Sequence, residues 1–323
     1  MDNYKFSKYE SSIDTFQDKL KKYGVAIIPN VLNEKEIKNF QNGIWDYLEH
    51  LTKNFEEPIN RNNESSWRSL RDLFPLHSML IQHWNIGHAQ FNWDIRQNSK
   101  VINVFAKLWN VKPDELVTSF DGASVHLPPE VTNLGWYKGN DWFHCDQSFM
   151  RNDFECVQTW VTAYDVNEGD ATLAFLEKSH KYHKNFKDDL NITEKADWYK
   201  LKTEEIDYYL NKKCNKTFIK CPAGSMVLWD SRTIHCGREC KKERVKPNFR
   251  GVSYVCMKPR NLSTEKDLEK KRKAFEELRT TSHWPNKVKL FSKTPRTYGK
   301  DLPDINLISK PKVSKLGMKL AGY

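Results

Sequence analysis

The sequence predicts a mainly β protein with flanking helices, in which one β core is wrapped by helices from both ends of the chain. Three observations support this fold class. Short runs of β-branched and aromatic residues fill the middle of the chain, loops of uneven length separate these runs, and helical periodicity is confined to the two ends. Short strands joined by such loops are typical of a sandwich or a jelly roll.

The first part of the chain, residues 1–115, is expected to be mainly helical. Residues 12–23 place apolar side chains at helical spacing, and Gly24 can end that helix. The stretch "VAIIPNVL" has the pattern of a short buried strand that closes with a Pro-Asn turn. From Asn33, a capping residue precedes a glutamate and an apolar stripe, which predicts a second helix. Residues 54–68 are polar and are expected to form a loop.

The β core is expected over residues 116–258. Its strand-like runs are "LVTSFDGASVHL", "ECVQTWVTAYDV", "TLAFLEKS", "TFIKCPAGSMVLWD" and "FRGVSYVCMK". Residues 188–212 interrupt these runs as a helical insertion. Residues 259–323 form a basic C-terminal part, which begins with the helical pattern "STEKDLEKKRKAFEELRTT". Because no change of composition marks a linker, we expect a single domain over residues 1–323.

Composition places the chain among globular proteins. Hydrophobic residues make up 38% and charged residues 29%, and no run of about 18 apolar residues predicts a membrane span. The first residues lack the apolar stretch of a signal peptide, and the seven scattered cysteines are typical of reduced thiols, so we expect a cytoplasmic location. The formal net charge of +10 can attract nucleic acid or another anion, although a lysine-rich surface also explains it. Nothing in the sequence indicates the oligomeric state.

Two residues of the segment "GNDWFHCDQS" can share a metal. Alternate side chains of a β-strand face the same way, so His144 and Asp146 project together while Cys145 faces away. A third ligand, His235, lies beyond the strand-like run "SMVLWD". Two imidazoles and one carboxylate suit Fe(II) and leave positions open for a substrate and O2. About fifteen residues later, Arg250 can hold a carboxylate of a bidentate keto acid through two parallel hydrogen bonds.

These motifs resemble those of the phytanoyl-CoA dioxygenase family of Fe(II)- and 2-oxoglutarate-dependent oxygenases. The similarity covers roughly residues 20–260, where "YGVAIIPNVLNEKEI", "FHCDQ", "TIHCG" and Arg250 occur in family order. Between them, "VQTWVTAYDVNEGDATLAFLEKSHKYH" is similar to the family's aromatic strand and the turn that follows it. The chain departs from the family pattern at "EKSH", which lacks the usual Pro and Gly.

The resemblance implies a double-stranded β-helix core with iron at His144, Asp146 and His235. It also implies that Arg250 binds the distal carboxylate of 2-oxoglutarate and that Trp160 lies beside this cosubstrate. The implied reaction couples decarboxylation of 2-oxoglutarate to hydroxylation of a substrate, consumes O2, and releases succinate and CO2. Related halogenases lack the carboxylate ligand, so the presence of Asp146 favours hydroxylation over halogenation.

Other assignments of these residues stay open. The interval between His235 and Arg250 is a few residues longer than in the family. Arg244 is therefore the alternative residue for binding the distal carboxylate of the keto acid. Zinc is the alternative metal, because thiolates and imidazoles suit it, although the chain has no C-x-x-C pair. The candidate zinc ligands are Cys145, Cys236 and Cys240. His180 and His183 are possible further ligands, but His180 is more simply a structural residue of the family turn.

The substrate is expected to be a small molecule that is bound by loops. Three regions are candidates: residues 54–96, residues 126–142 and the tail after Pro259. The tail is basic, which fits an anion site for the substrate, although a helix packed on the β core with a solvated cationic face also explains it. We expect residues 259–300 to fold back on the core and to bring a cation or a histidine to the mouth of the cavity. The candidate substrate residues are Trp142, Arg260, Arg279 and His283.

Two other functions are compatible with the sequence. The basic tail also fits a nucleic-acid-binding protein, or an oxygenase that acts on nucleic acid. The other alternative is an inactive β-helix that binds a metal and serves as a binding module. An intact metal triad and Arg250 argue against this last alternative.

Overall fold

Two six-stranded sheets and one two-stranded sheet form within residues 3–323, which the computed structural model describes. The strands are β1 (Tyr4–Lys5), β2 (Val25–Ile28), β3 (Leu80–Ile81), β4 (Leu116–Thr118), β5 (Ala123–His126), β6 (His144–Cys145), β7 (Val157–Thr162), β8 (Thr172–Leu176), β9 (Tyr199–Lys200), β10 (Lys216–Ile219), β11 (Met226–Asp230), β12 (His235–Arg238), β13 (Arg250–Val255) and β14 (Met257–Pro259). The first sheet has the order β1-β10-β8-β12-β6-β9, the second has the order β2-β11-β7-β13-β5-β3, and β14 pairs with β4. Neighbouring strands are antiparallel, except that β1 runs parallel to β10.

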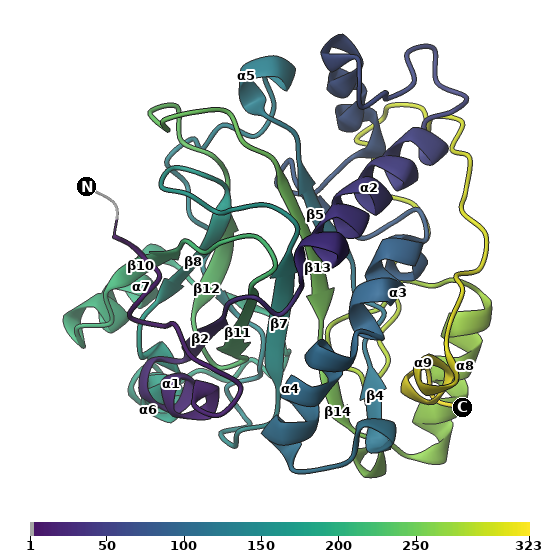
Figure 1. Cartoon of the computed structure of the whole chain (residues 1–323). Helices are drawn as coiled ribbons and strands as arrows, with labels where there is room; N and C mark the ends of the chain where they lie inside the picture. The colour runs from purple at the N-terminus through teal and green to yellow at the C-terminus, as the bar shows by residue number, and fades with distance from the viewer. Residues whose placement is uncertain (1–2) are drawn as a thin grey trace.

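Helices lie around the sheets (Figure 1). The α-helices are α1 (Phe16–Tyr23), α2 (Glu34–Leu51), α3 (Gln90–Arg96), α4 (Ser99–Trp109), α5 (Pro129–Thr132), α6 (His183–Asp189), α7 (Thr203–Asn211), α8 (Glu265–Glu276) and α9 (Lys315–Leu320). Short 3-10 helices are η1 (Glu64–Leu73), η2 (Ile86–His88), η3 (Pro113–Glu115), η4 (Ser179–Tyr182) and η5 (Arg260–Leu262). Figure 1 shows α8 and α9 beside β4, near the C-terminus. None of the described helices is long and apolar enough to cross a membrane.

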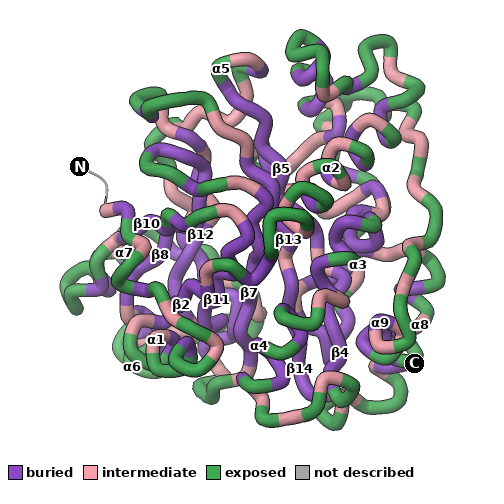
Figure 2. The backbone as a smooth tube through the Cα atoms, in the orientation of Figure 1, coloured by how far each residue is buried: buried purple, intermediate pink, exposed green. Residues whose placement is uncertain are grey.

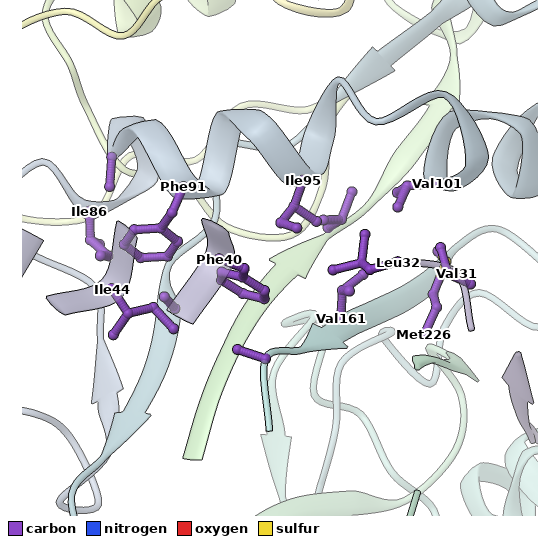
Figure 3. Packing of buried hydrophobic residues seen from close by; sticks show 14 of the residues in the cluster. Val31, Leu32, Phe40, Ile44, Ile86, Phe91, Ile95, Val101, Val161 and Met226 are labelled. Carbon is purple, nitrogen blue, oxygen red and sulfur yellow. The ribbon is translucent and has the colours of Figure 1, made fainter. Parts of the chain in front are cut away.

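Side chains of β7 alternate between two hydrophobic clusters, and this alternation defines the layers. Val161 belongs to the cluster that also contains Phe40 of α2 and Phe91 of α3, on the helical side of the second sheet (Figure 3). Trp160 faces the other way and packs with Phe175 of β8 in the first sheet. Because alternate residues of a strand point to opposite faces, the second sheet separates the helices from the space between the sheets. Figure 2 shows that this central part is the most buried.

The structure confirms the predicted fold class, a jelly-roll core of the double-stranded β-helix type with helices around it. Gly24 ends α1 in the left-handed region with φ of 82°, and Asn33 forms the expected capping box of α2 with Glu36. Two local predictions were wrong. Residues 54–68 were expected to form a loop, but η1 begins at Glu64. The insertion at 188–212 is helical only in part, because α6 ends at Asp189 and α7 begins at Thr203. It also contributes β9, which pairs with β6.

Candidate active site

His144, Asp146 and His235 converge on one cavity. His144 on β6 and His235 on β12 are register partners in adjacent antiparallel strands. The Nε2 atoms of His144 and His235 lie 3.6 Å and 3.4 Å from the carboxylate oxygens of Asp146. Within residues 3–323, this is the only group of three His, Cys, Asp or Glu side chains that could hold one metal ion, and its donor atoms all lie within 4.8 Å of one another.

Backbone carbonyls orient both imidazoles. The carbonyl of Trp142 lies 3.1 Å from Nδ1 of His144, and the carbonyl of Thr233 lies 2.9 Å from Nδ1 of His235. A carbonyl oxygen only accepts hydrogen bonds, so each Nδ1 must carry the proton. Each Nε2 therefore presents its lone pair to the centre of the triad, as a metal ligand requires.

Charge and burial favour the ligand form of the three side chains. Burial acts to raise the pKa of the Asp146 carboxyl, but the proximity of His144 holds that pKa well below its usual range. Burial, and then the proximity of His144, lowers the pKa of His235. Gln158 donates to Oδ2 of Asp146 at 2.9 Å and fixes the carboxylate. At neutral pH the triad thus offers a carboxylate and a neutral imidazole, the forms that bind a divalent metal.

The triad lines a cavity of about 720 Å³ that both six-stranded sheets and the tail enclose. Arg250, at the start of β13, lines the same cavity and is buried. Its Nε donates to Oγ of Ser124 at 3.0 Å, and its Nη1 donates to the carbonyl of Ala171 at 3.0 Å. Arg250 has no acidic partner within residues 3–323. A buried guanidinium without a counter-ion is costly, so its surroundings favour an anionic ligand.

Arg244, the alternative clamp, is engaged elsewhere. It forms ion pairs with Glu130, at 2.5 Å, and with Asp170, at 3.0 Å. Its side chain does not line the cavity. Of the two arginines, Arg250 is therefore the one that lines the cavity, whereas Arg244 joins the segment before β13 to α5 and to the turn before β8.

Tryptophan side chains supply unused hydrogen-bond donors to the same cavity. Four lining tryptophans have a buried indole N–H without a hydrogen-bond partner in the described part of the chain. They are Trp142, Trp160, Trp229 and Trp284. The ring of Trp160 lies 5.4 Å from the guanidinium carbon of Arg250. Buried donors are normally satisfied, so orphaned ones facing a cavity indicate the place of a polar ligand.

The structure brings two of the four candidate substrate residues to the cavity. Trp142 lines it and stacks on the ring of His144 with centroids 4.7 Å apart. His283 also lines it, and its buried Nε2 has no partner among residues 3–323. The tail therefore folds back on the core, as expected. Arg279 does not line the cavity, because it donates to the carbonyl of Phe291 and so holds the tail.

Arg260 lies outside the cavity, contrary to expectation. The strand that begins at Arg250 does not continue to it, since β13 ends at Val255 and β14 then joins the separate two-stranded sheet. The guanidinium of Arg260 instead donates to carbonyls at the C-terminal end of the chain. These carbonyls belong to Lys319, Gly322 and Tyr323.

The thiols and the remaining histidines do not join the triad. Cys145 faces away from the triad, and its Sγ lies 3.7 Å from Nδ1 of His183. Cys240 lies 3.3 Å from Nδ1 of His126, and His180 contacts the carbonyl of Lys21. The described residues thus provide no zinc site of the kind considered from the sequence.

Several lining residues were not identified from the sequence. Gln158 is two positions before Trp160 on β7, so strand alternation could have found it. Asp121, Trp198 and Lys287 carry no such signal, because they lie in loops or in the tail and reach the cavity only through the tertiary fold.

Comparison with known proteins places the chain among oxygenases. The family described as phytanoyl-CoA dioxygenase matches residues 20–244. The chain is 26% identical over 281 residues to the "Ava biosynthesis cluster protein O" of Aspergillus versicolor, which covers 84% of this chain and 86% of that protein.

Two solved structures share the fold at low sequence identity. One is a hypothetical protein from Escherichia coli, with a TM-score of 0.57 and 14% identity, covering 86% of this chain and 79% of that one. The other is the GlcNAc Inducible Gene 2 protein from Candida albicans, with a TM-score of 0.52 and 13% identity, covering 81% of this chain and 67% of that one.

Proposed function

Because this chain belongs to the phytanoyl-CoA dioxygenase family and is an Fe(II)- and 2-oxoglutarate-dependent oxygenase, we propose that His144, Asp146 and His235 hold its iron. The observation that carries this proposal is the convergence of their donor atoms within 4.8 Å in a buried site. Two imidazole nitrogens and one carboxylate fit Fe(II) and leave positions on the metal open. The proton positions on the two rings and the charge of Asp146 support the same assignment.

Arg250 and Trp160 are the proposed contacts of 2-oxoglutarate. The buried guanidinium would find its missing counter-ion in the distal carboxylate, and the free indole N–H beside it offers a further donor. When bound, iron and 2-oxoglutarate activate O2 to oxidise a substrate C–H bond, and the keto acid leaves as succinate and CO2.

The side chains of the cavity orient the reactants and exclude water. Gln158 and the carbonyls behind His144 and His235 keep the ligands in place, so little rearrangement accompanies binding. The aromatic walls keep bulk water from the reacting centre, which prevents side reactions. Because Asp146 occupies the place of the carboxylate ligand, the proposed outcome is hydroxylation and not halogenation.

The proposed substrate is a small molecule. A cavity of about 720 Å³ has the size of a drug-like ligand site. The name of the Aspergillus relative assigns that protein to a biosynthesis cluster, which also favours a metabolite as substrate here. The seven cysteines are all unpaired thiols, which favours a reducing compartment, so we place the protein in the cytoplasm.

Succinate formation tests the proposed function. Purified protein with Fe(II), 2-oxoglutarate and O2 would be screened against pools of metabolites, amino acids, peptides and oligonucleotides. We expect a metabolite fraction to stimulate succinate formation, and a His235→Ala variant to give none. If neither the fractions nor the protein alone produced succinate above that variant, the proposed activity would be incorrect.

A further inference from the structure

A second cavity adjoins the one that contains the triad. It has a volume of about 590 Å³, and we call it the outer cavity. The two cavities share four lining residues, which form the boundary between them: Leu76, His77, Gln82 and Phe291. His77 stacks on Trp142 with ring centroids 3.9 Å apart, and Trp142 stacks on His144. A continuous row of rings therefore leads from the triad to the outer cavity.

The charged side chains of the outer cavity are cations without adequate counter-ions. Arg71 and Arg296 line it, and no Asp or Glu does. Arg296 has no hydrogen bond or ion pair within residues 3–323. Among residues 3–323, Arg71 contacts only the adjacent Asp72, at 3.7 Å, which leaves most of its donors unused, and both arginines are exposed at the mouth of the cavity. Two free guanidinium groups in one concave site attract anions, and each can bind a carboxylate or a phosphate with paired hydrogen bonds.

The rest of the outer cavity is mostly uncharged. Burial lowers the pKa of His77 and of His83, so both rings are neutral at physiological pH and serve as hydrogen-bonding groups. The remaining lining combines apolar side chains, among them Phe74 and Leu134, with the neutral polar Ser78, Gln82 and Ser292. Such a site suits a ligand with an apolar body and an anionic end.

We propose that the outer cavity binds an anionic group of the substrate, a phosphate or a carboxylate, between Arg71 and Arg296. The apolar body of the substrate would then pass the boundary at His77 and Phe291 and place its reacting carbon in the inner cavity. The proposal rests on the oxygenase function, because it names one part of that enzyme's substrate. The anion site itself can be tested without turnover.

Three probes with the same phenyl ring test the site by isothermal titration calorimetry on the full chain without metal. They are phenyl phosphate, phenylacetate and the neutral benzyl alcohol. We expect at least one of the two anions to bind at least about tenfold more tightly than the alcohol, the effect of a charge-assisted hydrogen bond. A preference for phenyl phosphate would identify the substrate group as a phosphate ester, and a preference for phenylacetate would identify it as a carboxylate.

Variants then assign the binding to the two arginines. Arg71→Gln and Arg296→Gln should each lower the affinity for the preferred anion by about tenfold. Lys293→Gln removes one charge from the same exposed segment outside the cavity lining, so it should bind the anions like the wild type. Equal affinity for all three probes, no anion binding up to millimolar concentration, or unchanged binding in both arginine variants would overturn the proposal.

A separate titration distinguishes this proposal from the proposed function. Nickel-loaded protein would be titrated with 2-oxoglutarate, and the Arg296→Gln variant should keep the affinity of the wild type. Phenyl phosphate should still bind to the protein saturated with 2-oxoglutarate, because the two sites differ. Failure of 2-oxoglutarate to bind would count against the metal and keto-acid assignments and would leave the anion site unaffected.

Discussion

Arg250 and Arg244 lie six positions apart and have the same charge, yet their surroundings give them different roles. Ser124 and Ala171 hold Arg250 in the cavity with only neutral partners, whereas two carboxylates neutralise Arg244. Removing a partner from a buried pair of charges typically costs about 2–5 kcal/mol. The two arginines are therefore matched variants for one binding measurement.

The Arg250→Ala variant should weaken 2-oxoglutarate binding by about 2–5 kcal/mol, because the distal carboxylate would lose its counter-ion. Calorimetric titration of the nickel-loaded protein measures this loss. The Arg244→Ala variant should lower thermal stability but keep 2-oxoglutarate affinity, since its partners are Glu130 and Asp170. The reverse pattern would move the keto-acid site to Arg244.

As the proposed carboxylate ligand, Asp146 would determine the chemistry that the metal can support. The Asp146→Ala variant should lose most oxidation, because the metal would lose its only carboxylate ligand. Mass spectrometry of products formed in chloride buffer should show hydroxylated substrate from the wild type and no chlorinated product. A chlorinated product from the wild type would refute the assignment of Asp146 as a ligand.

At the scale of elements, short strands position the site. β6 has two residues, and its pairing with β12 sets His144 beside His235. Strand β5 ends at His126, which is fully buried. Nε2 of His126 contacts the carbonyl of Leu134 at 3.1 Å, and its Nδ1 lies 3.3 Å from the thiol of Cys240. These contacts connect β5 to the loop after α5 and to the segment after β12.

His126 should make the protein sensitive to acid. Burial lowers its pKa to about 4, below the usual value of 6.5. Between these values the unfolded chain binds a proton that the folded chain does not bind, so the free energy of unfolding falls as the pH drops from 6.5 towards 4. Urea denaturation of a His126→Gln variant should show a shallower fall over this range. The control is His50→Gln, at an exposed position, whose free energy of unfolding should fall with pH as steeply as that of the wild type. An equally steep fall in both variants would contradict the role of His126.

The elements that depend on local pattern could be predicted from the sequence, and so could the triad. The cap at Asn33 follows from the helical pattern, and the alternation expected for a strand paired His144 with Asp146, although β6 itself ends at Cys145. Local pattern could not locate Arg260, because the turn between β13 and β14 transfers the chain to another sheet. The lining of the outer cavity falls within the three substrate regions expected from the sequence, but local pattern could not pair Arg71 with Arg296, since the two residues are more than 200 positions apart.

On the scale of the whole molecule, the C-terminal part completes the cavity. Backbone hydrogen bonds join Thr281 to Phe120 and Phe291 to Thr280, and Trp284 is buried. This packing supports the prediction of a single domain over residues 1–323, which stays a prediction. The alternative of nucleic-acid binding also stays a prediction, and an affinity that falls steeply with salt would support it.

Limited proteolysis with trypsin should separate the docked part of the tail from its exposed part. We expect the first cuts after Lys293, Arg296 or Lys300, which are exposed, and late cleavage after Lys271, which is 1% exposed. Early cleavage after Lys271 would show that α8 leaves the core in solution. The sites of cleavage would be identified by mass spectrometry over a time course.

The central claim is that His144, Asp146 and His235 hold one metal beside 2-oxoglutarate. Anomalous diffraction from crystals grown with nickel and 2-oxoglutarate tests this claim most directly. We expect one metal peak bonded to both Nε2 atoms and to the carboxylate at about 2 Å, with the keto acid reaching from the metal to Arg250. A peak at the cysteines or elsewhere, or a keto acid that does not contact Arg250, would contradict the account.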